Sequence, residues 1–144
     1  MKFGFDIHGV IDALPKVFSF LTKAIIAAGG EVHILTGGTW SIELERQLKD
    51  ADIVWTHHFS AYDHLIETNV KIVGEIKFPD GTIQQKFEDG HWDQVKGEYC
   101  LKYDICLHID DTLIYNEFFK TPFSRIWTHN QKPKSSHKDI RHLD

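Results

Sequence analysis

Acidic and hydroxyl side chains follow three short apolar runs of this sequence, and their chemistry suits the binding of a metal ion and a phosphate. Asp6 ends the first run, Thr36 ends the second, and Asp110-Asp111 ends the last. If these runs are parallel strands of one sheet, their carboxyl ends converge and bring the polar groups together. Carboxylates held this close need a cation, and Mg²⁺ is a hard ion that prefers oxygen ligands. A bound phosphate would then complete the coordination of the ion.

The elements that must position these residues alternate as parallel sheets require. A strand, a helix, a second strand and a second helix are predicted over residues 2–7, 16–28, 31–35 and 39–49. Gly29-Gly30 ends the first helix, and Thr39 is the predicted N-cap of the second. Two such units favour parallel strands joined by right-handed crossovers, with ligands bound beyond the carboxyl ends of the strands.

One inserted hairpin interrupts this alternation. Pro79-Asp80-Gly81 is a strong turn signal, so the segment over about 72–88 is predicted to be a β-hairpin. The other predicted elements are a possible strand over 53–55, helices over 61–68 and 92–103, a strand over 104–109 and a final strand over 123–128. We predict a single α/β domain over 1–130, a Rossmannoid three-layer sandwich with a mostly parallel central sheet, and a polar C-terminal tail over 131–144.

The three strand-end motifs resemble, in the same order, motifs of the haloacid dehalogenase (HAD)-like hydrolase superfamily, here in a small, capless or minimally capped form. Residues 5–12 (FDIHGVID) are similar to its first motif, an apolar strand followed by Asp-x-Asp-Gly. Residues 32–37 (VHILTG) are similar to the second, which ends in Ser or Thr, and residues 107–111 (LHIDD) to the fourth, which ends in two acids. The resemblance spans roughly residues 1 to 128 and implies a HAD-like fold.

The resemblance also implies a Mg²⁺-dependent phosphomonoesterase that acts on a phosphorylated substrate of unknown identity. Asp6 would attack phosphorus, and water would then hydrolyse the aspartyl-phosphate. The implied Mg²⁺ ligands are the Asp6 carboxylate, the backbone carbonyl of His8, Asp110 and Asp111, with Asp111 as the preferred direct ligand and Asp110 acting through water or by holding a lysine. The Thr36 hydroxyl and the Gly37 amide would bind phosphate oxygens.

Lys96 is the predicted lysine of the third family motif, which offsets charge on the nucleophile and on the bound phosphate. It lies in the first turns of the helix that precedes the last acidic strand end, where the family places this lysine. Lys102 is nearer the far end of that helix, and Lys77 and Lys86 belong to the hairpin. A lysine suits the role because it brings a compact point charge to phosphate.

His8 departs from the family pattern, in which a second aspartate protonates the leaving oxygen and later activates water. Histidine ordinarily titrates near ~6.5 and is able to shuttle protons, so His8 is the candidate acid and base. Two alternatives to a fast phosphatase remain open. One is a slow enzyme with a long-lived aspartyl-phosphate, and the other is a non-catalytic phosphate- or nucleotide-binding module that keeps the fold and the metal site.

Other polar residues have simpler structural interpretations. Asp12 is expected to cap the turn before the first helix, and His57-His58 to be loop histidines that point to opposite faces. Cys100 and Cys106 are predicted to be reduced thiols on or near the core. A Zn²⁺ protein that uses some of the 10 histidines is the remaining functional class.

The net charge and the lengths of the apolar runs argue against further classes of function. The net charge of −5 offers no bulk attraction for a nucleic-acid backbone, so we predict no general nucleic-acid binding. Asp6 interrupts the apolar run that a signal peptide would need, and no apolar stretch is long enough to span a membrane. We therefore predict a cytoplasmic protein without a membrane segment, and the oligomeric state stays open.

Overall fold

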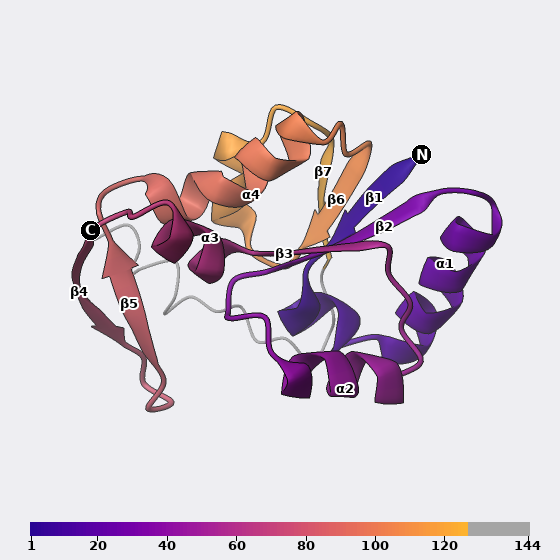
Figure 1. The fold of residues 1–144 in the computed structure, drawn as a ribbon, viewed down its shortest axis with the longest axis horizontal. Helices are drawn as coiled ribbons and strands as arrows, with labels where there is room; N and C mark the ends of the chain where they lie inside the picture. Colours follow the sequence, from indigo (N-terminus) through magenta and orange to yellow (C-terminus); the bar gives the residue numbers. More distant parts are fainter. Residues whose placement is uncertain (127–144) are drawn as a thin grey trace.

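The computed structural model describes residues 1–126, in which strands and helices alternate (Figure 1). The strands are β1 (Lys2–Phe5), β2 (Glu31–Thr36), β3 (His57–Ser60), β4 (Ile72–Lys77), β5 (Ile83–Phe87), β6 (Leu107–Asp110) and β7 (Phe123–Arg125). The helices are α1 (Pro15–Ala27), α2 (Ile42–Asp50), α3 (Ala61–Glu67) and α4 (His91–Lys102), with a π-type turn η1 (Ile7–Ile11) and a 3-10 helix η2 (Leu113–Phe118). Within the described range, the helices are too short or too polar to cross a membrane. The predicted domain end at residue 130 and the tail over 131–144 lie outside the described residues.

Five strands form one sheet in the order β3-β2-β1-β6-β7, and every neighbouring pair is parallel. The chain builds outward from β1 to β3 and then returns to place β6 and β7 on the other side of β1. In open parallel sheets, ligands generally bind at the carboxyl ends of the two strands that flank such a reversal, which are here β1 and β6. The prediction of an α/β fold with a mostly parallel central sheet is confirmed.

Helices cover both faces of this sheet, as the alternating side chains of β2 show. Ile34 belongs to an apolar core with Phe18 of α1 and Leu48 of α2. Its neighbour Leu35 packs with Cys100 of α4 in a separate core. Because successive side chains of a strand point to opposite faces, β2 is buried on both sides, as is usual for parallel sheets. Figure 1 shows the same layers, with α1 and α2 on one side of the sheet and α4 on the other.

The predicted hairpin is present as a separate antiparallel sheet of β4 and β5. Gly81 takes a positive φ of 87° in its turn, a conformation that glycine adopts without strain. Phe87 at the end of β5 packs with Leu65 of α3 and Val95 of α4, which anchors the base of the hairpin to the helices. The hairpin connects α3, which directly follows β3, to the start of α4, and it therefore belongs to the side of the sheet where the strands end.

The third strand lies later in the chain than predicted. Residues 53–55 form no strand, because Ile53 is buried as a loop residue in the core shared by α1 and α2. The chain reaches β2 only at Thr56, whose amide donates a hydrogen bond to the Val32 carbonyl at 2.9 Å. The strand β3 therefore begins after Thr56, and the prediction over 53–55 is wrong.

His57 and His58, predicted to be loop residues, are instead the first two residues of β3. Their rings do lie on opposite faces, as predicted. The His57 ring stacks on His33 with centroids 4.2 Å apart, whereas the His58 ring stacks on Trp40 at 4.0 Å. Both histidines thus stack on an aromatic neighbour.

Smaller differences concern the ends of elements. Ser41 rather than Thr39 is the N-cap of α2, because its hydroxyl accepts a backbone hydrogen bond of the first turn at 3.1 Å. The strand β6 begins later than residue 104, because Asp104 adopts a positive φ of 53° in the turn after α4. Of the predicted final strand over 123–128, the structure shows a strand ending at Arg125, and residues 127 and 128 lie outside the described range.

Candidate active site

Asp6 and Asp110 lie side by side because β1 and β6 are parallel neighbours. Phe5 is paired with Ile109, and the Asp6 amide donates a hydrogen bond to the Ile109 carbonyl at 3.0 Å. Asp110 is the last residue of β6, and Thr36 is the last residue of β2 on the other side of β1. All three polar residues therefore lie at the same edge of the sheet, the carboxyl edge where open parallel sheets generally bind ligands.

Lys96 of α4 joins the two carboxylates. Its ammonium nitrogen lies 2.9 Å from Asp6 Oδ1 and 2.9 Å from Asp110 Oδ2, and all three side chains are buried. Lys102, the alternative on the same helix, lies over the Tyr103 ring at 5.4 Å from its centroid. Lys96 therefore contacts both Asp6 and Asp110, the two acids with which the sequence analysis grouped it.

The buried charges change one another's protonation. Burial and the neighbouring carboxylate of Asp110 raise the pKa of Asp6 to about 7, against the opposing effect of Lys96. Burial also works against the charge of Asp110, but Lys96 and His108 hold its pKa well below the usual range. Burial alone would lower the pKa of Lys96, yet Asp110 and Asp6 outweigh it and hold that pKa above its ordinary value. A bound cation would work against this shift and lower the pKa of Asp6, since a cation favours the carboxylate.

His108 is a buried partner of Asp110 that the sequence expectations did not include. Its Nε2 lies 3.0 Å from Asp110 Oδ2, and Asp110 Oδ1 accepts a hydrogen bond from the Thr112 amide at 3.0 Å. Burial lowers the pKa of His108, so the neutral ring must carry its proton on Nε2 to donate to this carboxylate. Gly4 on the next strand leaves room for the ring, because a Cβ there would lie 2.7 Å from His108 Nδ1. The strand period was the available signal, since residues two apart share a face.

The acidic residues of the site form a group able to hold a metal ion. Asp6, Asp110 and Asp111 present oxygen atoms within 4.8 Å of one another. Asp111 is half-buried, and its carboxylate accepts a hydrogen bond from the Thr112 hydroxyl at 3.2 Å. Three carboxylates and one lysine leave negative charge in excess, which a divalent cation would offset. The donors are all oxygen atoms, so the residues present fit a hard divalent cation.

Thr36 and Gly37 form the strand-end turn on the other side of β1. Thr36 is buried, and its hydroxyl accepts a hydrogen bond from the Gly38 amide at 3.3 Å. The Gly38 carbonyl in turn accepts one from the Ser60 hydroxyl at 2.7 Å. Gly37 packs against Trp92 of α4, where a Cβ would lie 3.2 Å from the indole. The turn is thereby fixed between β3 and α4 at the carboxyl edge of the sheet.

The side chain of His8 is not part of the buried cluster. It is 74% exposed, and its Nδ1 lies 3.1 Å from Asp12 Oδ2. Asp12 Oδ1 also accepts a hydrogen bond from the Gly9 amide at 2.7 Å, and Gly9 has a positive φ of 78°. Asp12 therefore closes the turn before α1, the role expected of it. Proton transfer by His8 would have to come from an exposed ring that Asp12 orients.

Tyr115 of η2 is a neighbour of Lys96 that had no signal in the sequence. The Lys96 ammonium lies 5.3 Å from the Tyr115 ring centroid, and the Trp92 indole donates a hydrogen bond to the Tyr115 hydroxyl at 3.2 Å. Tyr115 lies in a short 3-10 helix, where no motif or periodicity marks one residue. Tyr115 and Trp92 thus connect the lysine to the Gly37 turn.

A scan of the chain against protein-family models found no match, and searches of curated proteins and of solved structures found none either.

Proposed function

We propose that this protein is a Mg²⁺-dependent phosphomonoesterase of the HAD-like type, with Asp6 as its nucleophile. The observation that carries the proposal is the Lys96 ammonium, which lies 2.9 Å from both Asp6 and Asp110 in a buried cluster. A lysine in this place offsets the charge of the nucleophile and can attract an incoming phosphate. The sheet order β3-β2-β1-β6-β7 supports the same proposal, since it gathers the three family-like motifs at one edge.

The Mg²⁺ ion would be held by Asp6, Asp111 and the backbone carbonyl of His8. Asp110 already accepts hydrogen bonds from Lys96 and two other groups, so it would contact the ion through water. Bound Mg²⁺ would neutralise phosphate charge and orient the phosphorus for in-line attack. This division leaves Asp111 as the more accessible of the two strand-end acids.

Asp6 Oδ2 is the attacking atom in this proposal, because Lys96 holds Oδ1. Attack forms a bond between Oδ2 and phosphorus and breaks the ester bond, whose electron pair leaves with the substrate oxygen. His8 would give that oxygen a proton and would then take one from the water that attacks the aspartyl-phosphate. The Thr36 hydroxyl, the Gly37 amide and Lys96 would bind the phosphate oxygens.

A non-catalytic or very slow phosphate- or nucleotide-binding protein is the second candidate, and the position of His8 favours it. The imidazole is exposed and contacts Asp12 rather than the buried cluster. A protein without an acid and base beside Asp6 would keep the metal and phosphate site but would turn over poorly. Both candidates predict that Asp6→Ala weakens Mg²⁺ binding, so binding alone does not separate them.

Turnover of p-nitrophenyl phosphate and of a panel of phosphorylated metabolites separates the two candidates. We expect Mg²⁺-dependent phosphate release by the wild type, and a loss on the order of a thousandfold or more in Asp6→Asn. Asp52→Asn is the matched control, because Asp52 pairs with Lys23 outside the site and its positive φ of 59° suits asparagine. Full turnover in Asp6→Asn would reject the proposed nucleophile. No release from mildly acidic to alkaline pH, with Mg²⁺ binding intact, would establish the binding role instead.

Replacing His8 tests the proton-transfer step. If histidine is a weak substitute for the aspartate of the family motif, His8→Asp should raise kcat. If His8 is the working acid and base, both His8→Asp and His8→Ala should lower it. Equal rates in the wild type and both variants would contradict any acid-base role for this residue.

A further inference from the structure

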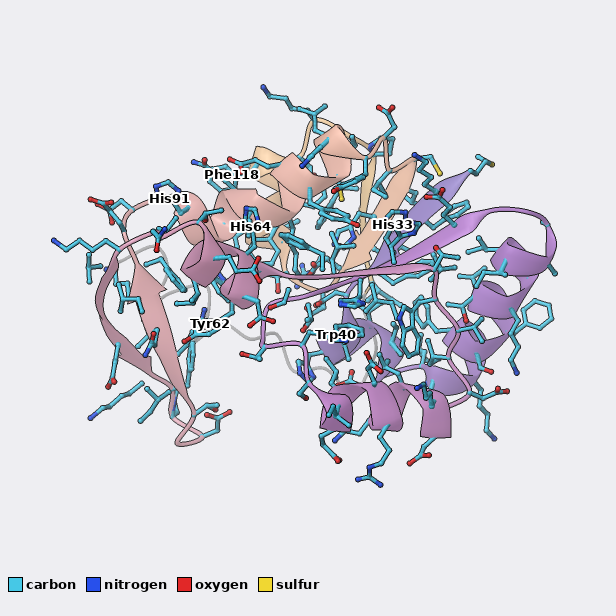
Figure 2. All side chains as sticks on the ribbon, in the orientation of Figure 1. His33, Trp40, Tyr62, His64, His91 and Phe118 are labelled. Atoms are coloured by element: carbon cyan, nitrogen blue, oxygen red, sulfur yellow. The ribbon has the colours of Figure 1, made fainter. Side chains whose placement is uncertain are left out.

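A second cluster of ionisable side chains lies at the opposite end of the same sheet. Glu31 is the first residue of β2, His33 follows two residues later, and His57 begins β3. His33 and His57 are register partners, and Glu31 shares a face with His33 because strand residues two apart point the same way. Figure 2 shows His33 on the α4 side of the sheet and Trp40 on the α2 side. The cluster therefore lies at the amino end of β2, away from Asp6.

Three potential ligand atoms come together in this cluster. Glu31 Oε2 lies 2.8 Å from His33 Nε2 and 3.9 Å from His57 Nδ1. One ligand atom from each residue lies within 4.8 Å of the other two. The two imidazole rings are stacked, with centroids 4.2 Å apart and an interplanar angle of 7°. Two imidazoles and one carboxylate are the ligand set of zinc sites that keep a fourth position for water.

His33 is oriented in the way that metal-binding histidines are oriented. The Tyr99 hydroxyl lies 2.7 Å from His33 Nδ1, which leaves Nε2 as the nitrogen that faces Glu31. A tyrosine hydroxyl accepts as well as donates hydrogen bonds. His33 can therefore carry its proton on Nδ1, donate a hydrogen bond from that N–H to the Tyr99 hydroxyl, and offer the Nε2 lone pair to a metal ion. In metal-bound histidines, the ring nitrogen that does not contact the metal regularly has a hydrogen-bond partner, which fixes the tautomer.

The other two ligands have room to adjust to an ion. The side chains of Glu31 and His57 are 37% and 47% exposed, whereas that of His33 is 1% exposed. Binding an ion would require rotation of the two exposed side chains, because their donor atoms must reach the metal–ligand distances of roughly 2.0–2.2 Å found in zinc sites. The cluster thus combines one fixed ligand with two adjustable ligands that face solvent.

We propose that Glu31, His33 and His57 bind a borderline divalent transition-metal ion, Zn²⁺ foremost, in a tetrahedral site completed by water. Imidazole nitrogen favours such ions over Mg²⁺, which prefers an all-oxygen ligand set. The ion replaces the hydrogen bond between His33 and Glu31 and joins β2 to the edge strand β3. Because it binds the folded chain, zinc should also raise the unfolding temperature.

Zinc binding to the full chain, measured by equilibrium dialysis with metal analysis, tests this site. We expect His57→Gln and Glu31→Gln to lose one equivalent of Zn²⁺, or to bind it at least about tenfold more weakly than the wild type. His58→Gln is the matched control, because its ring stacks on Trp40 on the opposite face of the same strand. All other histidines of the chain are present in both the variant and the control, so zinc bound to them does not affect the comparison. Equal zinc affinity and stoichiometry in the wild type, His57→Gln and His58→Gln would overturn the proposal.

A second variant separates this site from the acidic cluster around Asp6. Asp111→Asn should keep the zinc equivalent that His57→Gln loses. Substitution by Co²⁺ gives a spectroscopic check, since tetrahedral Co²⁺ absorption should appear in the wild type and in His58→Gln but not in His57→Gln. If Asp111→Asn instead removes the zinc and the Co²⁺ absorption while His57→Gln retains both, the ion binds at the acidic cluster and the proposal is wrong.

Discussion

The two ends of the central sheet carry clusters of opposite construction. The carboxyl-end cluster (Asp6, Lys96, Asp110 and Asp111) is mostly buried and contains its own ammonium group. The amino-end cluster (Glu31, His33 and His57) has one buried imidazole and two side chains open to solvent. The contacts of the carboxyl-end cluster are therefore made when the chain folds, whereas two of the three side chains of the amino-end cluster stay exposed to solvent.

The two clusters differ in what each requires when no metal ion is bound. Buried carboxylates are unfavourable unless a positive charge compensates them, and Lys96 provides that charge. A Mg²⁺ ion would thus add to a site that is already in place. At the amino end, an ion must order the exposed side chains of Glu31 and His57, which costs conformational entropy. Removing one charged or ligand side chain should therefore lower the free energy of unfolding far more at the carboxyl end than at the amino end.

The largest expected effect is that of Lys96→Ala on stability. Removing the ammonium leaves Asp6 and Asp110 buried without compensation, which should lower the free energy of unfolding by about 3–5 kcal/mol near pH 8. Urea denaturation in the presence of a chelator measures this change. Lys102→Ala, on the exposed side of the same helix, should change stability by no more than about 0.5 kcal/mol. Equal losses in the two variants would contradict the compensation of charge by Lys96.

The second prediction concerns the pH dependence of stability and uses Asp6→Asn. The pKa of Asp6 is raised from 3.8 to about 7 in the folded protein, chiefly by burial. An acid with a raised folded pKa favours the folded state below its ordinary pKa, and this contribution is lost as pH rises toward the folded pKa. The wild type should therefore lose stability relative to Asp6→Asn as the pH rises from about 4 to about 7. The difference in their free energies of unfolding should grow by at most about 4 kcal/mol over this range.

Urea denaturation of Asp6→Asn and the wild type over this pH range, without divalent metal, checks the prediction. Asp52→Asn is again the control, and its difference from the wild type should not follow this trend. Mg²⁺ should flatten the wild-type curve, because a bound cation favours the ionised form of Asp6. A constant difference between Asp6→Asn and the wild type would mean that burial does not shift this carboxyl group.

Much of the fold could be predicted because its signals are local. The helical period of the first helix and the turn at Pro79-Asp80-Gly81 each appear within a short segment. The strand β3 was misplaced because the apolar run over 53–55 is buried as a loop, while the real strand begins with two histidines. Tertiary packing supplies the aromatic partners of those histidines, and no short window of sequence contains them.

The sequence could predict which residues gather at the candidate site, but not the contacts that their side chains make there. Asp6 and Asp110 could be grouped because parallel strands end at one edge, whereas Lys96 was assigned through the resemblance to the third family motif, from its place on the preceding helix. The direction of the His8 ring depends on a turn closed by Asp12, which its residue types do not specify. The partner of His33 Nδ1 is the Tyr99 hydroxyl, which lies 66 residues away in the chain. Contacts of that kind require the packed structure.

Tyr99→Phe tests the amino end and should have a moderate effect. Loss of the hydroxyl leaves His33 Nδ1 buried without its partner, which should lower the free energy of unfolding by about 1–3 kcal/mol. Zinc affinity should also fall, by about 10- to 100-fold, because the imidazole loses the group that fixes its tautomer. Tyr103→Phe is the control on the same face, since Tyr103 packs near His33 through its ring. Unchanged zinc affinity in Tyr99→Phe would mean that His33 needs no such support.

The smallest expected effect is that of His57→Gln in the metal-free protein. His57 is 47% exposed, so its replacement should change the free energy of unfolding by no more than about 0.5 kcal/mol with a chelator present. With zinc at about 100 times its dissociation constant, the wild type should gain about 2.7 kcal/mol that His57→Gln does not. The two ends of the sheet would then differ as their burial implies, because one is stabilised by its own lysine and the other only by an added ion. A large loss in the metal-free variant would show instead that His57 is a structural residue of β3, and that the amino-end cluster is held together without metal.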